Sequence, residues 1–326
     1  MTALLLAAFL QANSGLPALA QDKPELVDCR KIWDQAPHNA FTDLIRFKDR
    51  WLCVFREGKT HVSPDGALRV LGSADGQTWT SEALVTLAGA DLRDAKITIT
   101  PDGRLMLSGV AHQPRPAEGS YQSMSWFSSD AKTWSEPAKV GDPDFWLWRV
   151  TWHKDRAYGI GYGCAGEKTV RLYSSADGKS FQTEVQTLFD QGYPNESSIL
   201  FQEDGSALCL LRRDEGSKTA QLGVAKAPYR EWTWKDLGTQ VGGPHLLRLP
   251  YGRIVAGGRR HEKGAHTALM WLDPAAGTAS EFLKLPSGGD TSYPGLVWHD
   301  GLLWVSYYSS HEGKTSIYLA RVKLPR

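Results

Sequence analysis

An all-β fold, a six-bladed β-propeller with four-stranded antiparallel blades, is the architecture that this sequence predicts. Two observations indicate it: a short turn motif that recurs three times, and a strand–turn–strand pattern that recurs six times. Repeats about 50 residues long are typical of propellers and other arrays. No long helical pattern competes with this interpretation.

The turn motif contains a serine, an aspartate two residues later, and then a hydroxyl residue followed by an aromatic residue. Asp-Gly favours a tight turn, and the aspartate carboxylate can accept hydrogen bonds from backbone N–H groups within that turn. The aromatic residue then packs where the next strand begins. The three copies are Ser73–Trp79, Ser128–Trp134 and Ser175–Phe181.

The six larger repeats each have a short apolar strand, a polar turn and a second apolar strand, which is the pattern of a β-hairpin. The first three are followed by two more strands separated by the turn motif, such as Ala67–Ser73 and Trp79–Leu87. Four strands per unit and six units predict the six-bladed propeller. The six hairpins are Phe41–Glu57, Asp94–Val110, Trp148–Gly163, Glu196–Arg213, Pro244–Arg260 and Tyr293–Ser309.

The sixth repeat has only three strands, of which the last is Ser316–Val322. An unused strand, Glu25–Trp33, precedes the first hairpin. We expect it to pair as the fourth strand of the last blade, which would close the ring and remove an exposed sheet edge. Residues 21–326 then form a single propeller domain.

The first residues of the chain indicate where the protein is located, and its charge indicates which kinds of partner it binds. Residues 1–20 have the apolar run and Ala-x-Ala ending of a secretory signal peptide, so we expect a secreted or periplasmic protein. The chain has 37 basic and 36 acidic residues and no basic run, which argues against a nucleic-acid or membrane partner. Its four cysteines are scattered, and free thiols and disulfides are equally compatible with them. We expect a monomer with no metal and no other cofactor.

Charged and polar residues open the first strand of every predicted blade. In a propeller these strands line the central channel, so their first residues face a ligand at its mouth. Burial of carboxylates and cations there would be costly without a purpose. We therefore interpret the set as a polar binding site: Asp43, Asp94, Lys96, Arg149, Glu196, His245 and Tyr293.

Arginines end the second strand of three predicted blades: Arg56, the pair Arg212 and Arg213, and the pair Arg259 and Arg260. The planar guanidinium group binds a carboxylate with two hydrogen bonds and stays charged. Because neighbours on a strand alternate faces, only one arginine of each pair can point to the site. Alignment of the hairpins favours Arg212 and Arg259, which we expect to converge with Arg56 on one substrate carboxylate.

Six segments resemble parts of exo-α-sialidases (neuraminidases). The turn motifs resemble the Asp boxes, or BNR repeats, of that family, and Phe55–Glu57 resembles the motif that carries its first arginine. Asn195–Leu200, followed by Arg212, resembles the segment with the catalytic glutamate and second arginine. Ser292–Leu296 resembles the segment with the tyrosine nucleophile. The resemblance covers nearly all of residues 21–326.

The resemblance implies an exo-acting glycoside hydrolase that removes a terminal acidic sugar, sialic acid first, from a glycan or glycoconjugate with retention of configuration. It makes Tyr293 the nucleophile and Glu196 the base that accepts its proton. Asp94 becomes the acid, with Asp91 in the same loop as an alternative. A neutral tyrosine suits this chemistry, because the carboxylate on the anomeric carbon of a sialoside would repel an anionic nucleophile.

Further residues complete the expected site and leave other interpretations open. We expect Asp43, Arg149 and His61 to bind substrate as well. Arg149 and His61 have no counterpart in the sialidase pattern, and a pocket reshaped by them would suit another acidic sugar such as a uronic acid. Where sialidases have a glutamate that supports the first arginine, this chain has Ser306–Tyr308, so Glu57 or Glu312 would have to take that part. A polysaccharide lyase and a non-catalytic carbohydrate-binding propeller are the interpretations from other classes.

Overall fold

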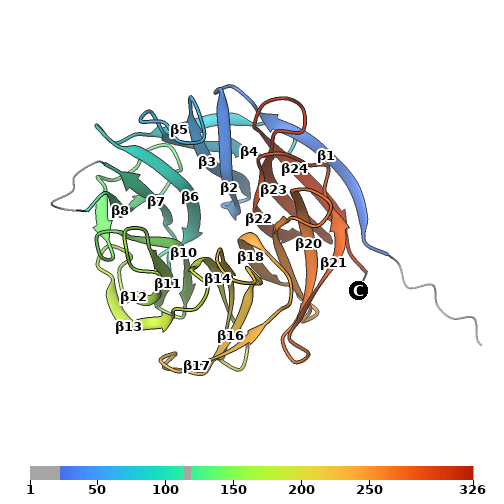
Figure 1. Cartoon of the computed structure of the whole chain (residues 1–326). Coiled ribbons are helices and arrows are strands. Elements are labelled where there is room, and N and C mark those ends of the chain that lie inside the picture. Colours follow the sequence, from blue (N-terminus) through green and yellow to red (C-terminus); the bar gives the residue numbers. More distant parts are fainter. Residues whose placement is uncertain (1–22, 114–118, 326) are drawn as a thin grey trace, which may run out of the picture.

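Six four-stranded antiparallel sheets are arranged as blades around a central axis in the computed structural model, which describes residues 23–113 and 119–325 (Figure 1). This confirms the predicted all-β, six-bladed propeller. The expected signal peptide, residues 1–20, lies outside the described residues. Across the described ranges, we find no helix with the length and apolar character that crossing a membrane requires.

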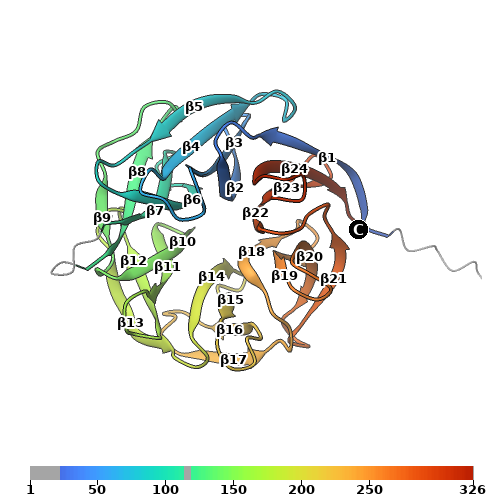
Figure 2. The ribbon, with the colours of Figure 1, turned by 45° about the horizontal axis from the view of Figure 1, so that its top comes forward.

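Blades 1 to 5 each use four strands that follow one another along the chain from the channel outwards (Figure 2). Blade 1 contains β2 (His38–Phe47), β3 (Arg50–Gly58), β4 (Ala67–Ser73) and β5 (Thr80–Val85). Blade 2 contains β6 (Asp91–Ile99), β7 (Leu105–His112), β8 (Tyr121–Ser128) and β9 (Ala138–Val140). Blade 3 contains β10 (Phe145–His153), β11 (Arg156–Gly163), β12 (Val170–Ser175) and β13 (Gln182–Phe189). Blade 4 contains β14 (Pro194–Phe201), β15 (Ala207–Arg213), β16 (Gln221–Ala225) and β17 (Trp232–Asp236), and blade 5 contains β18 (Gly242–Arg248), β19 (Ile254–Arg260), β20 (His266–Asp273) and β21 (Thr278–Lys284).

Blade 6 combines strands from both ends of the chain. β22 (Thr291–His299), β23 (Leu302–Ser309) and β24 (Ser316–Lys323) repeat the order of the other blades. β1 (Glu25–Trp33) pairs antiparallel with β24 on the outside, where Figures 1 and 2 show the blue strand beside the red one. The pairing covers the open edge of β24 and ties the start of the described chain to its end.

The three recurring turns share one hydrogen-bond pattern. In the first, Asp75 Oδ1 accepts from the backbone N–H groups of Gln77 and Thr78, each at 2.8 Å, and Ser73 Oγ accepts from the N–H of Gly76 at 2.8 Å. The other two copies repeat these bonds at Asp130 and Asp177. The fixed serine and aspartate therefore build the turn itself.

A fourth turn repeats part of this pattern in blade 5, where the sequence does not show the full motif. Asp273 Oδ1 accepts from the N–H groups of Ala275 and Ala276, each at 2.9 Å. The serine and the aromatic residue of the motif are missing, so only the carboxylate bonds remain. Of the side chains of the motif, only the aspartate therefore contributes to this turn.

The apolar core is divided into six clusters, one between each pair of neighbouring blades. The cluster between blades 6 and 1 contains Trp51 and Trp304, whose ring centroids are 4.2 Å apart. Burial of such side chains stabilises the ring by holding each blade against the next. All four cysteines are free thiols, and Cys53 and Cys209 are buried within these clusters.

The innermost strand of every blade has a bulge at the same place, where two residues oppose one residue of the second strand. A bulge re-aims side chains and locally bends the strand. The six bulged pairs are Phe41-Thr42, Asp94-Ala95, Trp148-Arg149, Asn195-Glu196, Gly243-Pro244 and Tyr293-Pro294. Three of these pairs contain the predicted catalytic residues.

Removal of β1 tests the contribution of the closing strand. A chain that begins at Asp34 loses the cover that Leu26, Ile32 and Trp33, all half-buried, give to blades 6 and 1. We expect it to lose roughly 3 kcal/mol of unfolding free energy from this lost burial, or about 10 °C in melting temperature. A chain that begins at Lys23 keeps β1 and is the control; equal melting temperatures for the two chains would contradict the assigned function of this strand.

Candidate active site

Two residues from blades 4 and 6, which are separated by one blade, meet at the mouth of the channel. The hydroxyl group of Tyr293, on β22, donates a hydrogen bond of 2.5 Å to Oε1 of Glu196, on β14. Tyr293 has a φ angle of 53° and Ser292 before it one of 101°, a left-handed backbone that non-glycine residues seldom adopt. Such strain clusters at functional sites, because the surrounding structure must hold it in place.

Arg212 and a backbone amide complete the surroundings of Glu196. Arg212 Nη1 lies 2.7 Å from Glu196 Oε2 and 3.1 Å from the Tyr293 hydroxyl oxygen. Gly243 donates its N–H to the same Oε2 at 2.7 Å, and a Cβ atom at Gly243 would lie 2.7 Å from the Tyr293 ring. Asp214 Oδ1 accepts from Arg212 Nε at 2.9 Å and so orients the guanidinium group. These contacts with Arg212 and Gly243 therefore fix the positions of Glu196 and Tyr293.

Tyr293 and Glu196 differ in protonation, and this difference allows a proton to pass from one to the other. Burial raises the pKa of Tyr293 far above its usual value, and the negative charge of Glu196 raises it further. Burial would also raise the pKa of Glu196, but the charge and hydrogen bond of Arg212 outweigh it and lower that pKa. The site thus contains a neutral phenol next to an ionised carboxylate that can accept its proton.

Arg259 lies over the Tyr293 ring, with its Cζ atom 5.1 Å from the ring centroid. Its Nε donates to the backbone oxygen of Thr291 at 2.8 Å, and Nη2 donates to the Tyr308 hydroxyl at 3.2 Å. The neighbouring arginines face elsewhere: Arg213 Nη2 is 2.6 Å from Asp236 Oδ2, and Arg260 pairs with Glu262. Of each pair, Arg212 and Arg259 are the members that reach Tyr293.

Asp94 is the buried acidic residue of the bulge in β6, with a φ angle of 52°. Its Oδ1 has no hydrogen-bond partner among the described residues. Burial raises the pKa of Asp94 to about 6, against the opposing positive charge of Lys96 and with help from the negative charge of Glu196. A carboxyl group whose pKa is raised towards neutral pH is suited to act as a general acid.

Arg56 does not join Arg212 and Arg259, which corrects the expectation of a three-arginine cluster. Its side chain is completely buried, and Nη2 forms a 2.7 Å ion pair with Asp91 Oδ1. Nη1 donates to the backbone oxygen of Thr60 and Nη2 to that of Ser63. Arg56 therefore braces the loop that follows β3 instead of facing a ligand.

The same ion pair distinguishes the two aspartates of the acid loop and corrects the expected partner of Arg56. Asp91 is committed to Arg56 and to Arg93, whose Nε lies 2.7 Å from Asp91 Oδ2, so Asp94 is the aspartate of this loop that is free to act. The carboxylate partner of Arg56 is neither Glu57 nor Glu312. Those two glutamates pair with other residues, namely Arg69 and Lys31.

Asp43 and Arg149 form the floor of the site. Arg149 Nη1 lies 2.8 Å from Asp43 Oδ2, and both residues are buried. Burial lowers the pKa of the nearby His245 to about 3, and the charge of Arg149 lowers it as well, so this imidazole is neutral. Lys96 lies over the Trp148 ring at 4.7 Å, and burial lowers its pKa to about 8.

A cavity of about 650 Å³ starts at this floor and follows the inner strands towards the other face of the ring. Asp43, Arg149 and His245 line its upper end, and Arg46 and Arg248 lie further along. Asp43 and Arg149, two of the residues that were expected to bind substrate, therefore line this cavity. Their side chains are paired with one another.

His61 lies at the rim of the site and is exposed. Its ring packs edge-on against Phe41 at 5.1 Å, and Phe41 packs in the same way against Tyr293 at 5.0 Å. Trp148 supports the other side of Tyr293 at 5.5 Å. Phe41 and Trp148 were missed from sequence, although both stand at the bulge position of their strands.

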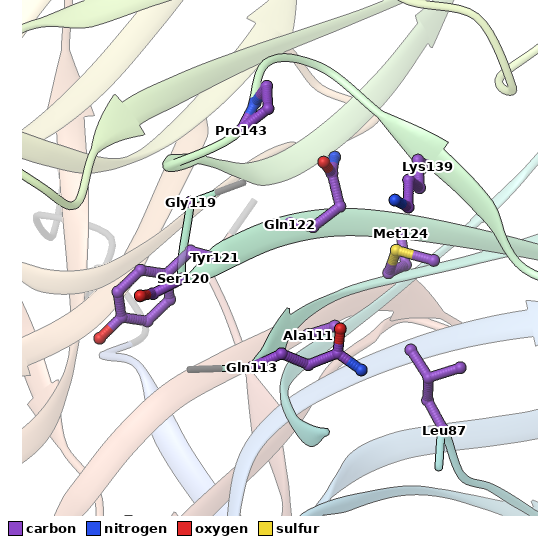
Figure 3. A pocket seen from close by; sticks show the side chains of 10 residues that line it. All are labelled: Leu87, Ala111, Gln113, Gly119, Ser120, Tyr121, Gln122, Met124, Lys139 and Pro143. Atoms are coloured by element: carbon purple, nitrogen blue, oxygen red, sulfur yellow. The ribbon is translucent and has the colours of Figure 1, made fainter. Parts of the chain in front are cut away.

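A separate pocket of about 530 Å³ lies on blade 2, among β7, β8, β9 and flanking residues (Figure 3). Gln113, Gln122 and Lys139 supply its polar groups, and Tyr121 forms part of its wall. None of its lining residues carries a carboxylate, and none is a predicted site residue. It has no acid–base pair comparable to the one at the channel mouth.

Comparison with known proteins supports the fold. No family model and no curated protein matches the sequence. Among solved structures, a protein of unknown function from Dyadobacter fermentans superposes with a TM-score of 0.83 at 20% identity, covering 92% of this chain and 99% of its own. An α-L-arabinanase from Penicillium chrysogenum, complexed with arabinobiose, has a TM-score of 0.69 at 15% identity, with 90% and 98% covered. A sialidase from Trypanosoma rangeli, in complex with the inhibitor DANA, has a TM-score of 0.68 at 12% identity, with 88% of this chain and 55% of its own covered. At such identities the likeness establishes the fold, and the activity must be argued from the site.

Substitution of Asp94 by asparagine tests whether burial raises the pKa of this carboxyl group. The folded-state pKa of about 6 lies above the usual value of about 3.9. The stability that protonated Asp94 contributes is therefore present at low pH and is lost as the pH rises through 6. An asparagine side chain cannot ionise, so Asp94→Asn should raise the melting temperature at pH 7.5 much more than at pH 4.5, as calorimetry would measure.

The control for this prediction is Asp49→Asn, because the Asp49 side chain is fully exposed. We expect that change to leave the melting temperature nearly the same at both pH values. A shift of equal size at pH 4.5 and 7.5 in Asp94→Asn would show that Asp94 ionises normally in the folded protein.

Proposed function

We propose that this protein is an exo-acting glycoside hydrolase that removes a terminal acidic sugar, of the sialic acid class, with retention of configuration. The observation that carries the proposal is the 2.5 Å hydrogen bond from the Tyr293 hydroxyl to Glu196, with two guanidinium groups beside it. A hydroxyl group hydrogen-bonded to a base is the arrangement of an activated nucleophile. Sialidases are the glycosidases in which that nucleophile is a tyrosine.

The charge of the substrate explains why a tyrosine would be used. A sialoside carries a carboxylate on its anomeric carbon, and this group repels an anionic nucleophile. The neutral hydroxyl group of Tyr293 avoids the repulsion, and Arg212 and Arg259 are the cations beside it that can hold the sugar carboxylate. The expected signal peptide at residues 1–20 agrees with a substrate outside the cytoplasm.

The reaction takes place in two steps. In the first, the Tyr293 oxygen forms a bond to the anomeric carbon and its proton passes to Glu196, while Asp94 gives a proton to the departing glycosidic oxygen. In the second, the Asp94 carboxylate takes a proton from water, whose oxygen attacks the anomeric carbon from the opposite side. The bond to Tyr293 breaks, Glu196 returns the proton to the phenol, and the free sugar leaves with its original configuration.

A second candidate is a hydrolase of neutral terminal sugars such as L-arabinofuranose. The burial of Arg56 favours it, because only two guanidinium groups remain near Tyr293 and Arg212 is already paired with Glu196. On a neutral sugar Glu196 could itself be the nucleophile, with Asp94 as the acid and Tyr293 as a positioning residue. The α-L-arabinanase of the same fold is consistent with this alternative.

Tyr293→Phe separates the two candidates. We expect a loss of hydrolysis of about 10³-fold or more on an acidic glycoside, since the change removes the nucleophilic oxygen and leaves the ring packing intact. Initial rates of sugar release from a panel of sialosides, uronosides and arabinosides would measure it. Tyr173→Phe is the matched control, because Tyr173 is equally buried and its hydroxyl group also donates to a carboxylate, Asp142, at 2.8 Å.

Each result on the panel has a distinct meaning. Release of a neutral sugar that persists in Tyr293→Phe and stops in Glu196→Gln would select the second candidate. A product with a new carbon–carbon double bond would identify a lyase. Binding without any product would identify a carbohydrate-binding propeller, and these last two results would both overturn the proposal of a hydrolase.

A further inference from the structure

We propose that His38, His61 and Asp290 form a binding site for a divalent transition-metal ion, of which Zn²⁺ fits best, at the rim of the channel mouth. His38 is the first residue of β2, His61 lies in the connection between β3 and β4, and Asp290 directly precedes β22. Ring closure between blades 6 and 1 brings these three segments together. The sequence alone predicted no metal, and the proposal does not depend on the function proposed above.

The three side chains offer a suitable set of ligand atoms. Asp290 Oδ2 lies 3.1 Å from His38 Nε2 and 2.8 Å from His61 Nδ1, and the possible ligand atoms all lie within 4.8 Å of one another. Ligand atoms about 2.0–2.2 Å from a tetrahedral zinc ion are separated by roughly 3.3 Å. Small side-chain movements would therefore admit the ion without a change in the backbone.

The carboxylate is already oriented by its neighbours. Asp290 Oδ1 accepts from the Tyr308 hydroxyl at 2.7 Å, and the Asp290 N–H donates to Ser310 Oγ at 2.9 Å. These bonds leave Oδ2 directed at the two imidazoles. A second layer of hydrogen bonds that fixes a ligand in this way is a common feature of metal centres.

Two imidazoles and one carboxylate are also the protein part of open metal sites, in which further positions are left for water or substrate. His61 has 52% of its side chain exposed, so an ion can reach the site from solvent. The His38 side chain is mostly buried, and its Nδ1 has no partner among the described residues. Without an ion, the two ring nitrogens that face the carboxylate donate hydrogen bonds to it; on binding, each ring would move that proton to its other nitrogen or release it, and would present a lone pair to the ion.

The site is linked to Tyr293 by two contacts. Tyr308 donates to Asp290 and accepts from Arg259, whose guanidinium group covers the Tyr293 ring. Phe41 packs against both His61 and Tyr293. A bound ion would hold Asp290 and His61 in place and would thereby stabilise this side of the site.

Zinc titration of the chelator-treated full chain, followed by calorimetry, tests the proposal. We expect one Zn²⁺ per chain, and binding at least tenfold weaker in His61→Ala and in Asp290→Asn. His61 is the preferred position because its side chain is exposed and its removal leaves the core intact, and melting curves would verify the fold. His311→Ala is the matched control, since His311 is a partly exposed histidine hydrogen-bonded to Ser309, and its affinity should equal that of the unchanged protein.

Zinc should also raise the melting temperature of the unchanged protein but not that of His61→Ala, because a ligand that binds only the folded state stabilises it. X-ray absorption of the zinc-loaded protein should show two imidazole ligands. Absence of saturable binding, or equal affinity in His61→Ala, would overturn the proposal. Glycoside hydrolysis enters none of these readouts, so their outcome is independent of the proposed activity.

Discussion

A two-residue bulge, present at the same register in all six inner strands, determines where each side chain at the channel mouth points. The bulge interrupts the regular alternation of faces, so that a residue that would otherwise continue the strand is turned towards the axis. Tyr293, Glu196 and Asp94 all belong to these pairs, as do Phe41 and Trp148, which pack around Tyr293. The same bulge thus shapes the inner strands of the propeller and positions the candidate catalytic residues.

The bulges and the charges buried at them are energetically unfavourable, and the surrounding structure offsets this. Left-handed backbone at Phe41, Asp94 and Tyr293 is unfavourable, and burial of charged groups is more so. The apolar clusters between blades and the closing strand β1 supply stability that is independent of the site. Hydrogen bonds to Glu196 from Tyr293 and Gly243, with the ion pair to Arg212, then satisfy the buried carboxylate.

The architecture could be predicted because its signals are local. A turn such as Ser73–Trp79 encodes its own hydrogen bonds, and each hairpin is contiguous in sequence. The choice of Arg212 over Arg213 likewise follows from alternation along a strand and from alignment of the hairpins. The sequence left two candidates for the general acid, Asp91 and Asp94, because only the folded loop shows that Asp91 is bound to Arg56.

The rest of the site depends on contacts between distant segments, which no local pattern reports. Arg56 matched a motif, but its environment is set by the loop after β3 and by β6 folding against it. Asp214, two residues beyond Arg212, was also missed, although residues at i and i+2 share a strand face. His38, His61 and Asp290 meet only when the ring closes.

Trapping of a covalent intermediate tests the central claim, that Tyr293 is the nucleophile, most directly. A glycosyl fluoride of the acidic sugar with a second fluorine next to the anomeric centre slows breakdown of the sugar–enzyme bond more than its formation. After incubation with such a compound and proteolysis, mass spectrometry should find the mass of the sugar on the peptide that contains Tyr293. The same sugar mass on the peptide that contains Glu196, with Tyr293 unmodified, would contradict the account.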